Sequence, residues 1–144
     1  MSKKKSPPPG GSNFSHDGWV IFLVRISAGL LMFFLHGLGK LSGAAGYLRG
    51  HKWAMIDAVG SLGFPLPGLF ALLSTGAEAI AALFLALGLF TRMSAWMLAI
   101  NMLVACWSHV SRGETPEMAL LYLVAAVAVA RLGPGKLALD SFRG

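Results

Sequence analysis

The sequence predicts an all-α integral membrane protein, a four-helix bundle with a short interfacial helix between the first two spans. Composition is the first observation behind this prediction: 56% of the 144 residues are hydrophobic, 12% are charged, and the mean hydropathy is +0.67. The charged fraction is about half that of a soluble domain. The second observation is a set of four apolar segments of about 17–23 residues, each long enough to cross a ~30 Å hydrocarbon core as a helix.

The sequence divides into a tail and the domain that forms this bundle. Residues 1–17 are polar, rich in proline and glycine, and without periodicity, so we expect a disordered cytoplasmic tail. Residues 18–144 form the predicted transmembrane domain. A basic start before an apolar run also fits a signal peptide, but no small-x-small cleavage site follows and further spans come later, which favours a retained first span.

The first two spans each carry one charge. The first covers residues 18–36 and contains Arg25, and the second covers residues 68–90 and contains Glu78. Within the connection, residues 37–67, the stretch HKWAMIDAVGSLGF has apolar residues at helical spacing. This spacing predicts a short helix in the membrane interface, and a re-entrant plug over the bundle is the alternative.

The last two spans are bounded by turn signals. The third covers residues 92–109 and contains Asn101, and it follows the second after so short a link at Phe90 that the two helices must be antiparallel neighbours. The fourth covers residues 116–132, with proline at a first-turn position and Gly-Pro-Gly after its end.

Basic residues indicate the orientation. An even number of spans puts both termini on one side, and that side carries seven basic residues: Lys3, Lys4, Lys5, Arg92, Arg131, Lys136 and Arg143. The other side carries four: Lys40, Arg49, Lys52 and Arg112. The excess predicts that both termini are cytoplasmic. No basic stripe alternates with aromatic residues, so the net charge of +6 does not indicate nucleic-acid binding.

Three stretches carry a resemblance to a known family: VRISAGLLMFFLHGLGKL in the first span, GLFTR after the second, and GPGKLALD after the fourth. The chain resembles the DoxX family of small four-span bacterial membrane proteins, with Ala138 where the family usually has serine. The resemblance implies an inner-membrane location and a link to redox metabolism, since relatives include the DoxD-type subunit of a thiosulfate:quinone oxidoreductase. The family often has glycines after its glutamate, whereas alanines and an isoleucine follow Glu78 here, which puts glycine-dependent close approach in doubt.

Helical periodicity gathers the polar and small residues of each span on one face. The predicted faces are Arg25, Gly29, Met32 and His36; Ser74, Thr75, Glu78, Ala81 and Ala82; Ser94, Met97, Asn101, Ala105 and Ser108, with His109 beside them; and Glu117, Leu121, Val124 and Ala128. We expect these faces to meet inside the bundle.

Candidate site residues follow from these faces. The ligand-binding candidates are His36, Lys40, Glu78, Asn101, His109 and Glu117, which would face one outer cavity. Among them Glu78, His36 and His109 are the proton-relay candidates, and the two histidines are predicted to act as a pair. Arg25, Arg92 and Arg131 are assigned structural or orientation roles. No metal site is predicted, because no His-x-x-x-His or Glu-x-x-His spacing occurs within a helix.

The partner of Glu78 is the sharpest expectation. A carboxylate at membrane depth needs a polar partner or marks a function. Helical side chains lean toward their own N-terminus, so Glu78 is expected to lean outward toward His36, while Arg25 snorkels to the cytoplasmic headgroups.

Three functions remain open at this point. The chain is a quinone-interacting subunit of a membrane redox complex, a non-catalytic anchor or assembly partner of a redox or stress-response enzyme, or a small-solute or proton pathway. Cys106 is the one cysteine, which counts against electron transfer through a thiol pair within this chain. The expected partners are the lipid bilayer, a protein of the complex, and a quinone or small anion. No intrinsic cofactor is expected.

Overall fold

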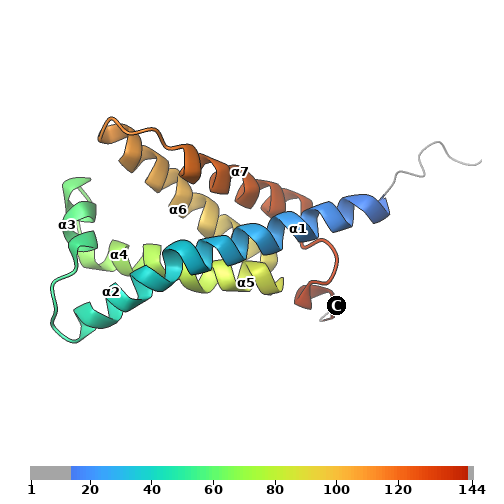
Figure 1. The fold of residues 1–144 in the computed structure, drawn as a ribbon, viewed down its shortest axis with the longest axis horizontal. Coiled ribbons are helices and arrows are strands. Elements are labelled where there is room, and N and C mark those ends of the chain that lie inside the picture. Colours follow the sequence, from blue (N-terminus) through green and yellow to red (C-terminus); the bar gives the residue numbers. More distant parts are fainter. Residues whose placement is uncertain (1–13, 143–144) are drawn as a thin grey trace, which may run out of the picture.

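A helical segment of unusual length begins the part of the chain described by the computed structural model, residues 14–142. Helix α1 (Phe14–Met32) passes through a π-helical turn (Phe33–Gly37) into α2 (Leu38–Leu48), so helical structure continues twelve residues beyond the predicted end at 36 (Figure 1). The helix also starts before the predicted boundary at residue 18, and the rest of the predicted tail, residues 1–13, lies outside the described residues.

The second helical segment is also interrupted by a π turn. After the short helix α3 (Ala54–Ser61), α4 (Pro67–Gly76) leads into a π turn (Ala77–Ala81) and then α5 (Ala82–Leu87). The proline at the start of α4 suits a first-turn position, where the missing N–H has no intrahelical acceptor. Helix α3 shows that the first connection contains a short helix.

The remaining helices form a hairpin. Helix α6 (Thr91–Ser111) follows α5 after a tight turn with Phe90 in the left-handed region at φ 46°. Helix α7 (Glu117–Leu132) packs along α6, and the described part of the chain ends in a 3-10 turn (Leu139–Phe142) (Figure 1). Within residues 14–142 every element is helical, as predicted.

Among residues 14–142, three helices are long and apolar enough to cross a membrane: residues 18–48, 67–87 and 91–111. Their apolar surfaces suit contact with a lipid bilayer, so the chain is a membrane protein. Helix α7, at 16 residues, is shorter than these three.

Close packing of the first two helical segments depends on glycines of α1 and its π turn. A Cβ at Gly29 would lie 2.7 Å from the carbonyl oxygen of Ala82, and one at Gly37 would lie 2.5 Å from that of Glu78. Backbones therefore approach directly, as small residues permit in membrane helices. Alanines and an isoleucine follow Glu78, but the two helical segments still approach closely because the first segment supplies the glycines.

The start of α1 and the C-terminal turn lie at the same end of the molecule, which we call the terminal end; α3 lies at the opposite, α3 end (Figure 1). At the terminal end, Arg25 is fully buried and donates to the carbonyl oxygens of Leu85 and Ala86 at 3.1 Å each. It also donates to the backbone of Lys136 at 3.3 Å and Leu137 at 3.4 Å.

This position corrects the expectation that Arg25 snorkels to the headgroups. Carbonyl groups at a helix end lack intrahelical donors, and the end of α5 presents them to the guanidinium. The C-terminal segment completes the contact. Its Asp140 carboxylate accepts the backbone N–H groups of Phe90 at 2.8 Å and Thr91 at 2.7 Å, at the start of α6. Arg25 and Asp140 together tie the C-terminal segment to the α5–α6 hairpin.

The predicted inner face of the fourth span is wrong. Leu121 and Val124 are more than half exposed, and Glu117 is exposed as well. The buried face of α7 is instead Ala119, Tyr122, Ala126, Val129 and Ala130. The prediction assumed that the face carrying Glu117 points inward. The buried face is instead rich in alanine, whose small side chain lets α7 approach α6 closely.

Candidate functional site

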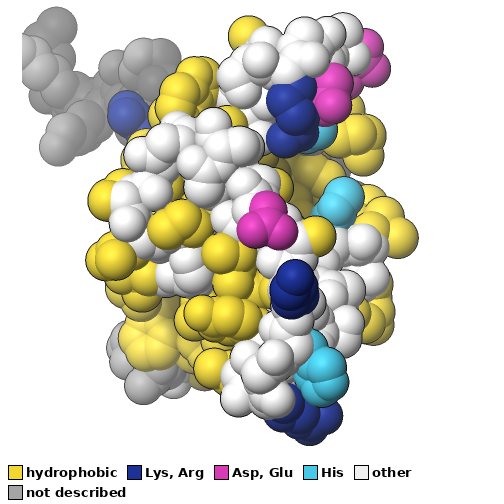
Figure 2. Space-filling model, turned by 90° about the vertical axis from the view of Figure 1, so that its left-hand side faces the viewer, with side chains coloured by type: hydrophobic (Ala, Val, Ile, Leu, Met, Phe, Trp, Pro, Cys, Tyr) yellow, Lys and Arg dark blue, Asp and Glu magenta, His cyan; other side chains and the backbone are white. Residues whose placement is uncertain are grey.

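A cavity with a volume of about 620 Å³ opens at the α3 end, and we call it the larger cavity. It lies between α2, α3, α4 and α6, and most of its walls are apolar. The apolar side chains around it include Trp53, Met55, Val59, Leu62, Phe64, Phe70, Leu73, Met97, Ile100 and Val104. Figure 2 shows this end of the molecule, where charged and histidine side chains run from top to bottom through the centre and right of the face, with hydrophobic side chains to either side.

A polar cluster centred on Glu78 interrupts these apolar walls. The Lys40 ammonium lies 2.5 Å from Oε1 of Glu78, and the Asn101 amide donates to the same oxygen at 2.8 Å. Lys40 also donates to the hydroxyl of Ser74 at 3.3 Å. The Glu78 side chain is 5% exposed and that of Lys40 is 29% exposed. A buried carboxylate is thus held by one cation and one amide from two other helices, as a charge at this depth requires.

Two π turns position this cluster. Glu78 lies in the turn of residues 77–81, and the turn of residues 33–37 packs against it through Gly37. A π turn adds one residue to a helix and re-aims the side chains around it, and such turns are frequent at functional sites. Beyond Gly37 the helix continues, and this continuation brings Lys40 to the carboxylate.

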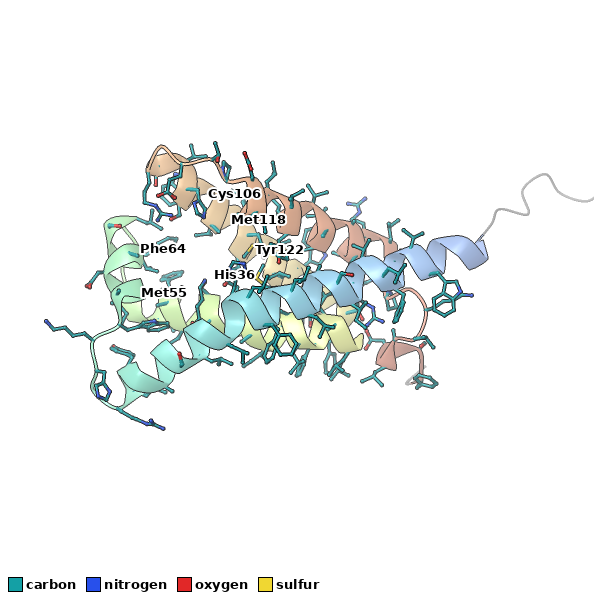
Figure 3. The ribbon with its side chains drawn as sticks, viewed as in Figure 1. His36, Met55, Phe64, Cys106, Met118 and Tyr122 are labelled. Atoms are coloured by element: carbon teal, nitrogen blue, oxygen red, sulfur yellow. The ribbon has the colours of Figure 1, made fainter. Side chains whose placement is uncertain are left out.

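A second cavity, about 150 Å³ in volume, lies on the other side of the ion pair. It is bounded by α1 with its π turn, by α6 and by α7. Lys40, Glu78, Ala105 and His109 line both cavities. The rings of His36 and Tyr122 meet edge to face across it, 6.0 Å apart (Figure 3). The Lys40–Glu78 pair therefore forms part of the wall between the two spaces.

At the rim of the larger cavity, His109, Arg112 and Glu114 form an exposed charged group. Glu114 accepts from Arg112 Nε and Nη2 at 3.2 Å each, and its Oε2 lies 2.7 Å from His109 Nδ1. The hydrogen bonds from Arg112 first, and from His109 second, hold the pKa of Glu114 below its usual range. This end of α6 thus presents two basic side chains and one ionised carboxylate.

The expected Glu78–His36 pair is wrong in its main point. The bonds to the carboxylate come from Lys40 and Asn101, while His36 lines only the second cavity. Lys40 lies one turn after His36 and reaches hydrogen-bond distance of the Glu78 carboxylate, so the ammonium takes the place expected for the imidazole. Arg25 is not the partner either, because its guanidinium binds backbone carbonyls at the terminal end.

The candidates were expected to face one outer cavity, but the structure divides them between two cavities. Lys40, Asn101 and His109 line the larger cavity, and His36 and His109 line the smaller one, whereas Glu117 lines neither. The predicted face of the third span is largely right, since Met97, Asn101, Ala105 and Ser108 line the larger cavity. Ser94 is buried and donates to the carbonyl oxygen of Leu89.

Sequence reasoning missed several residues of this region. Trp53, Phe64 and Arg112 line the larger cavity, and Tyr122 lines the smaller one. One signal was available: His36 and Lys40 are four residues apart and share a helix face if the helix continues. Trp53 and Phe64, which flank α3, and Tyr122 in α7 carried no comparable signal, because their contacts with other helices are decided in three dimensions.

Comparison with known proteins gives one match. A family model described as DoxX matches residues 20–110, more than half of the chain. This range covers α1 to α6 almost to its end and includes Lys40, Glu78, Asn101 and His109. No curated protein and no solved structure matches the chain.

Proposed function

The chain belongs to the DoxX family, and we propose that its larger cavity binds a quinone headgroup as one subunit of a membrane redox complex. The observation that carries the proposal is the placement of the Lys40–Glu78–Asn101 cluster in the wall of an apolar cavity. Small-molecule sites combine such apolar walls with a few convergent polar groups, in volumes of about 300–1,000 Å³.

A quinone has the chemistry that this cavity would accept. Its flat ring and apolar tail suit aromatic walls such as those of Trp53 and Phe64, and its carbonyl oxygens need hydrogen-bond donors. Lys40 and Asn101 supply donors at the cluster. Because the helices around the cavity are apolar, a ligand dissolved in the bilayer would reach the opening at the α3 end from the membrane interface.

Proton handling supports the same assignment. Reduction of a quinone to a quinol takes up two electrons and two protons. In this proposal the electrons come from a protein partner in the complex, and Glu78 and His109 exchange protons with the bound headgroup. Both side chains line the cavity, and His109 also reaches the exposed rim, where water can supply protons.

The membrane arrangement is part of the proposal. In it, α7 is the fourth crossing, α3 lies in the outer interface, and both termini lie in the cytoplasm of a bacterial cell with the bundle in its inner membrane. The support is that α1 and the C-terminal turn share one end of the molecule, together with the seven-to-four split of basic residues (Figure 1). A reporter active only in the periplasm should be silent after Gly144 and active when inserted at Gly113; activity after Gly144 would overturn the orientation.

The ligand test starts from the chain purified without added ligand. Solvent extraction and chromatography should recover a quinone in near-stoichiometric amount. The double variant Lys40→Met/Glu78→Gln removes both charges without leaving one unpaired, and it should lose most of the quinone. Lys52→Met, an exposed lysine outside both cavities, is the matched control and should retain it.

The competing function is a non-catalytic anchor or assembly partner. That role would be favoured if the purified chain carried a stoichiometric protein partner and no quinone, and if the double variant kept the same partner. This result would contradict quinone binding. Retention of quinone by Lys40→Met/Glu78→Gln would place the ligand elsewhere on the chain.

A further inference from the structure

The second cavity has a composition that the quinone proposal does not use. Three of the chain's seven methionines and two of its four histidines line this space of about 150 Å³. They come from separate elements: Met32 and His36 from the first helical segment, Met102 and His109 from α6, and Met118 from α7. The five potential donors therefore converge from three sides of one small space.

Burial differs among these donors in a way that suits a ligand site. Met32 is 1% exposed and Met102 is 4% exposed, on facing helices. His36 and Met118 are exposed at the edge of the cavity, where Figure 3 shows them beside the gap between α1 and the α6–α7 hairpin. The cavity thus has thioether groups at depth and one imidazole with one thioether at its opening, where an ion would arrive.

Packing alone does not explain this concentration well. Methionine is a common filler of irregular cores, and two of the five donors could serve only that purpose. The buried face of α7, however, consists largely of alanines. Met32 and Met102 belong to the packed core but also border the open space of this cavity, and Met118 is exposed at its edge.

We propose that the second cavity binds a soft monovalent cation, Cu(I), through methionine thioethers and histidine imidazoles. Thioether sulfur is a soft, neutral donor that selects Cu(I), and imidazole also suits copper. Hard cations such as Mg²⁺ and Ca²⁺ require oxygen ligands instead. In residues 14–142 no three His, Cys, Asp or Glu side chains come together to hold a metal, so the cavity lacks the donor set of a usual zinc site.

Charge at the cavity is compatible with a single positive ion. Lys40 lines the space, but its ammonium is paired with the Glu78 carboxylate at 2.5 Å. A divalent ion on neutral donors beside this pair would carry a much larger desolvation cost than a monovalent one. The sequence predicts no metal site because it has no His-x-x-x-His or Glu-x-x-His spacing within a helix. That criterion does not apply to methionine ligands.

The experiment uses the full chain in detergent. Cu(I) is delivered from a chromogenic chelator under reducing conditions, and Ag(I), which needs no reductant, is titrated separately by calorimetry. We expect one tightly bound equivalent of each. The double variant Met102→Leu/Met118→Leu keeps side-chain volume and should weaken binding at least tenfold. Met55→Leu/Met97→Leu, which changes two methionines of the larger cavity, is the matched control and should bind as the parent does.

Further variants keep the proposal falsifiable if the first variant folds poorly. His36→Gln changes an exposed side chain at the cavity edge and should also weaken binding, whereas His51→Gln, outside both cavities, should not. The proposal is overturned if the parent does not compete with the chelator, or if the control variants lose as much affinity as the cavity variants. Cu(I) binding does not depend on the larger cavity holding a quinone, so the two proposals fail separately.

Discussion

Lys40 and Glu78 form an ion pair 2.5 Å long between residues 38 positions apart in the chain, and the pair lines both cavities. The pair joins α2 to the π turn between α4 and α5, so the two helical segments are tied together where the two spaces meet. The two side chains differ in exposure, since Glu78 is buried whereas Lys40 is partly exposed. A change at this pair is therefore expected to alter both the stability of the fold and the binding of the proposed ligand.

Removing one charge of the pair should destabilise the fold more than removing both. Lys40→Met leaves the buried carboxylate with Asn101 as its remaining partner, and the expected cost is on the order of 3 kcal/mol. Lys40→Met/Glu78→Gln should recover at least half of that loss. Unfolding in detergent, followed by tryptophan fluorescence, measures both, with Lys52→Met expected within about 0.5 kcal/mol of the parent. Additive losses in the double variant would mean that the two side chains do not interact.

Gly37 should be intolerant of even one methyl group. A Cβ there would lie 2.5 Å from the Glu78 carbonyl oxygen, so Gly37→Ala forces the two π turns apart, at a cost of about 1–3 kcal/mol. Gly39→Ala is the matched control on the same segment, because a Cβ at Gly39 meets nothing within 4 Å. The control should be neutral or slightly stabilising, since alanine favours helix. Equal unfolding midpoints for the two variants would contradict the close approach.

Arg25 should be required in its own geometry and not only for its charge. Its guanidinium donates to four backbone carbonyls on two segments, and the single ammonium of lysine cannot reproduce that fork. Arg25→Lys should therefore cost about 1.5–3 kcal/mol and loosen the C-terminal segment.

Proteolysis of the C-terminal segment and the unfolding midpoint measure this effect. Arg131→Lys changes an exposed arginine and serves as the control, expected to behave as the parent does. If Arg25→Lys is as stable and as resistant to protease as the parent, the hydrogen bonds from Arg25 to the four carbonyls at the terminal end are not important for stability.

Glu114 should titrate below the usual range of a glutamate. Its lowered pKa means that the stabilisation it provides is present above its ordinary pKa and is lost as pH falls through the lowered value. Carbon-13 NMR of the Glu114 side chain should show this midpoint directly. Arg112→Gln should raise the midpoint toward the ordinary value more than His109→Gln does, because Arg112 is the larger cause. An unchanged midpoint in Arg112→Gln would contradict the hydrogen-bonded geometry.

The sequence alone determined those features that depend on local composition and on the periodicity of single helices. Apolar length defined the helices around residues 18–36, 68–90 and 92–109, because the hydrophobic effect acts on each segment separately. The short link at Phe90 required a hairpin. An isolated carboxylate in an apolar run marked Glu78 as a candidate site residue, and helical periodicity placed Asn101 on the cavity face of its helix.

Tertiary structure alone decided which side chains meet. The first helix continues past Gly37 because that glycine packs on the backbone of another segment, and only this continuation delivers Lys40 to Glu78. Arg25 is buried because its acceptors come from residues 60 to 112 positions away. The inner face of α7 was misassigned because both faces of this helix are apolar, so the periodicity of apolar residues did not distinguish the inner face from the outer one. Partners so distant in sequence leave no local pattern, and their contacts follow from how the helix backbones pack.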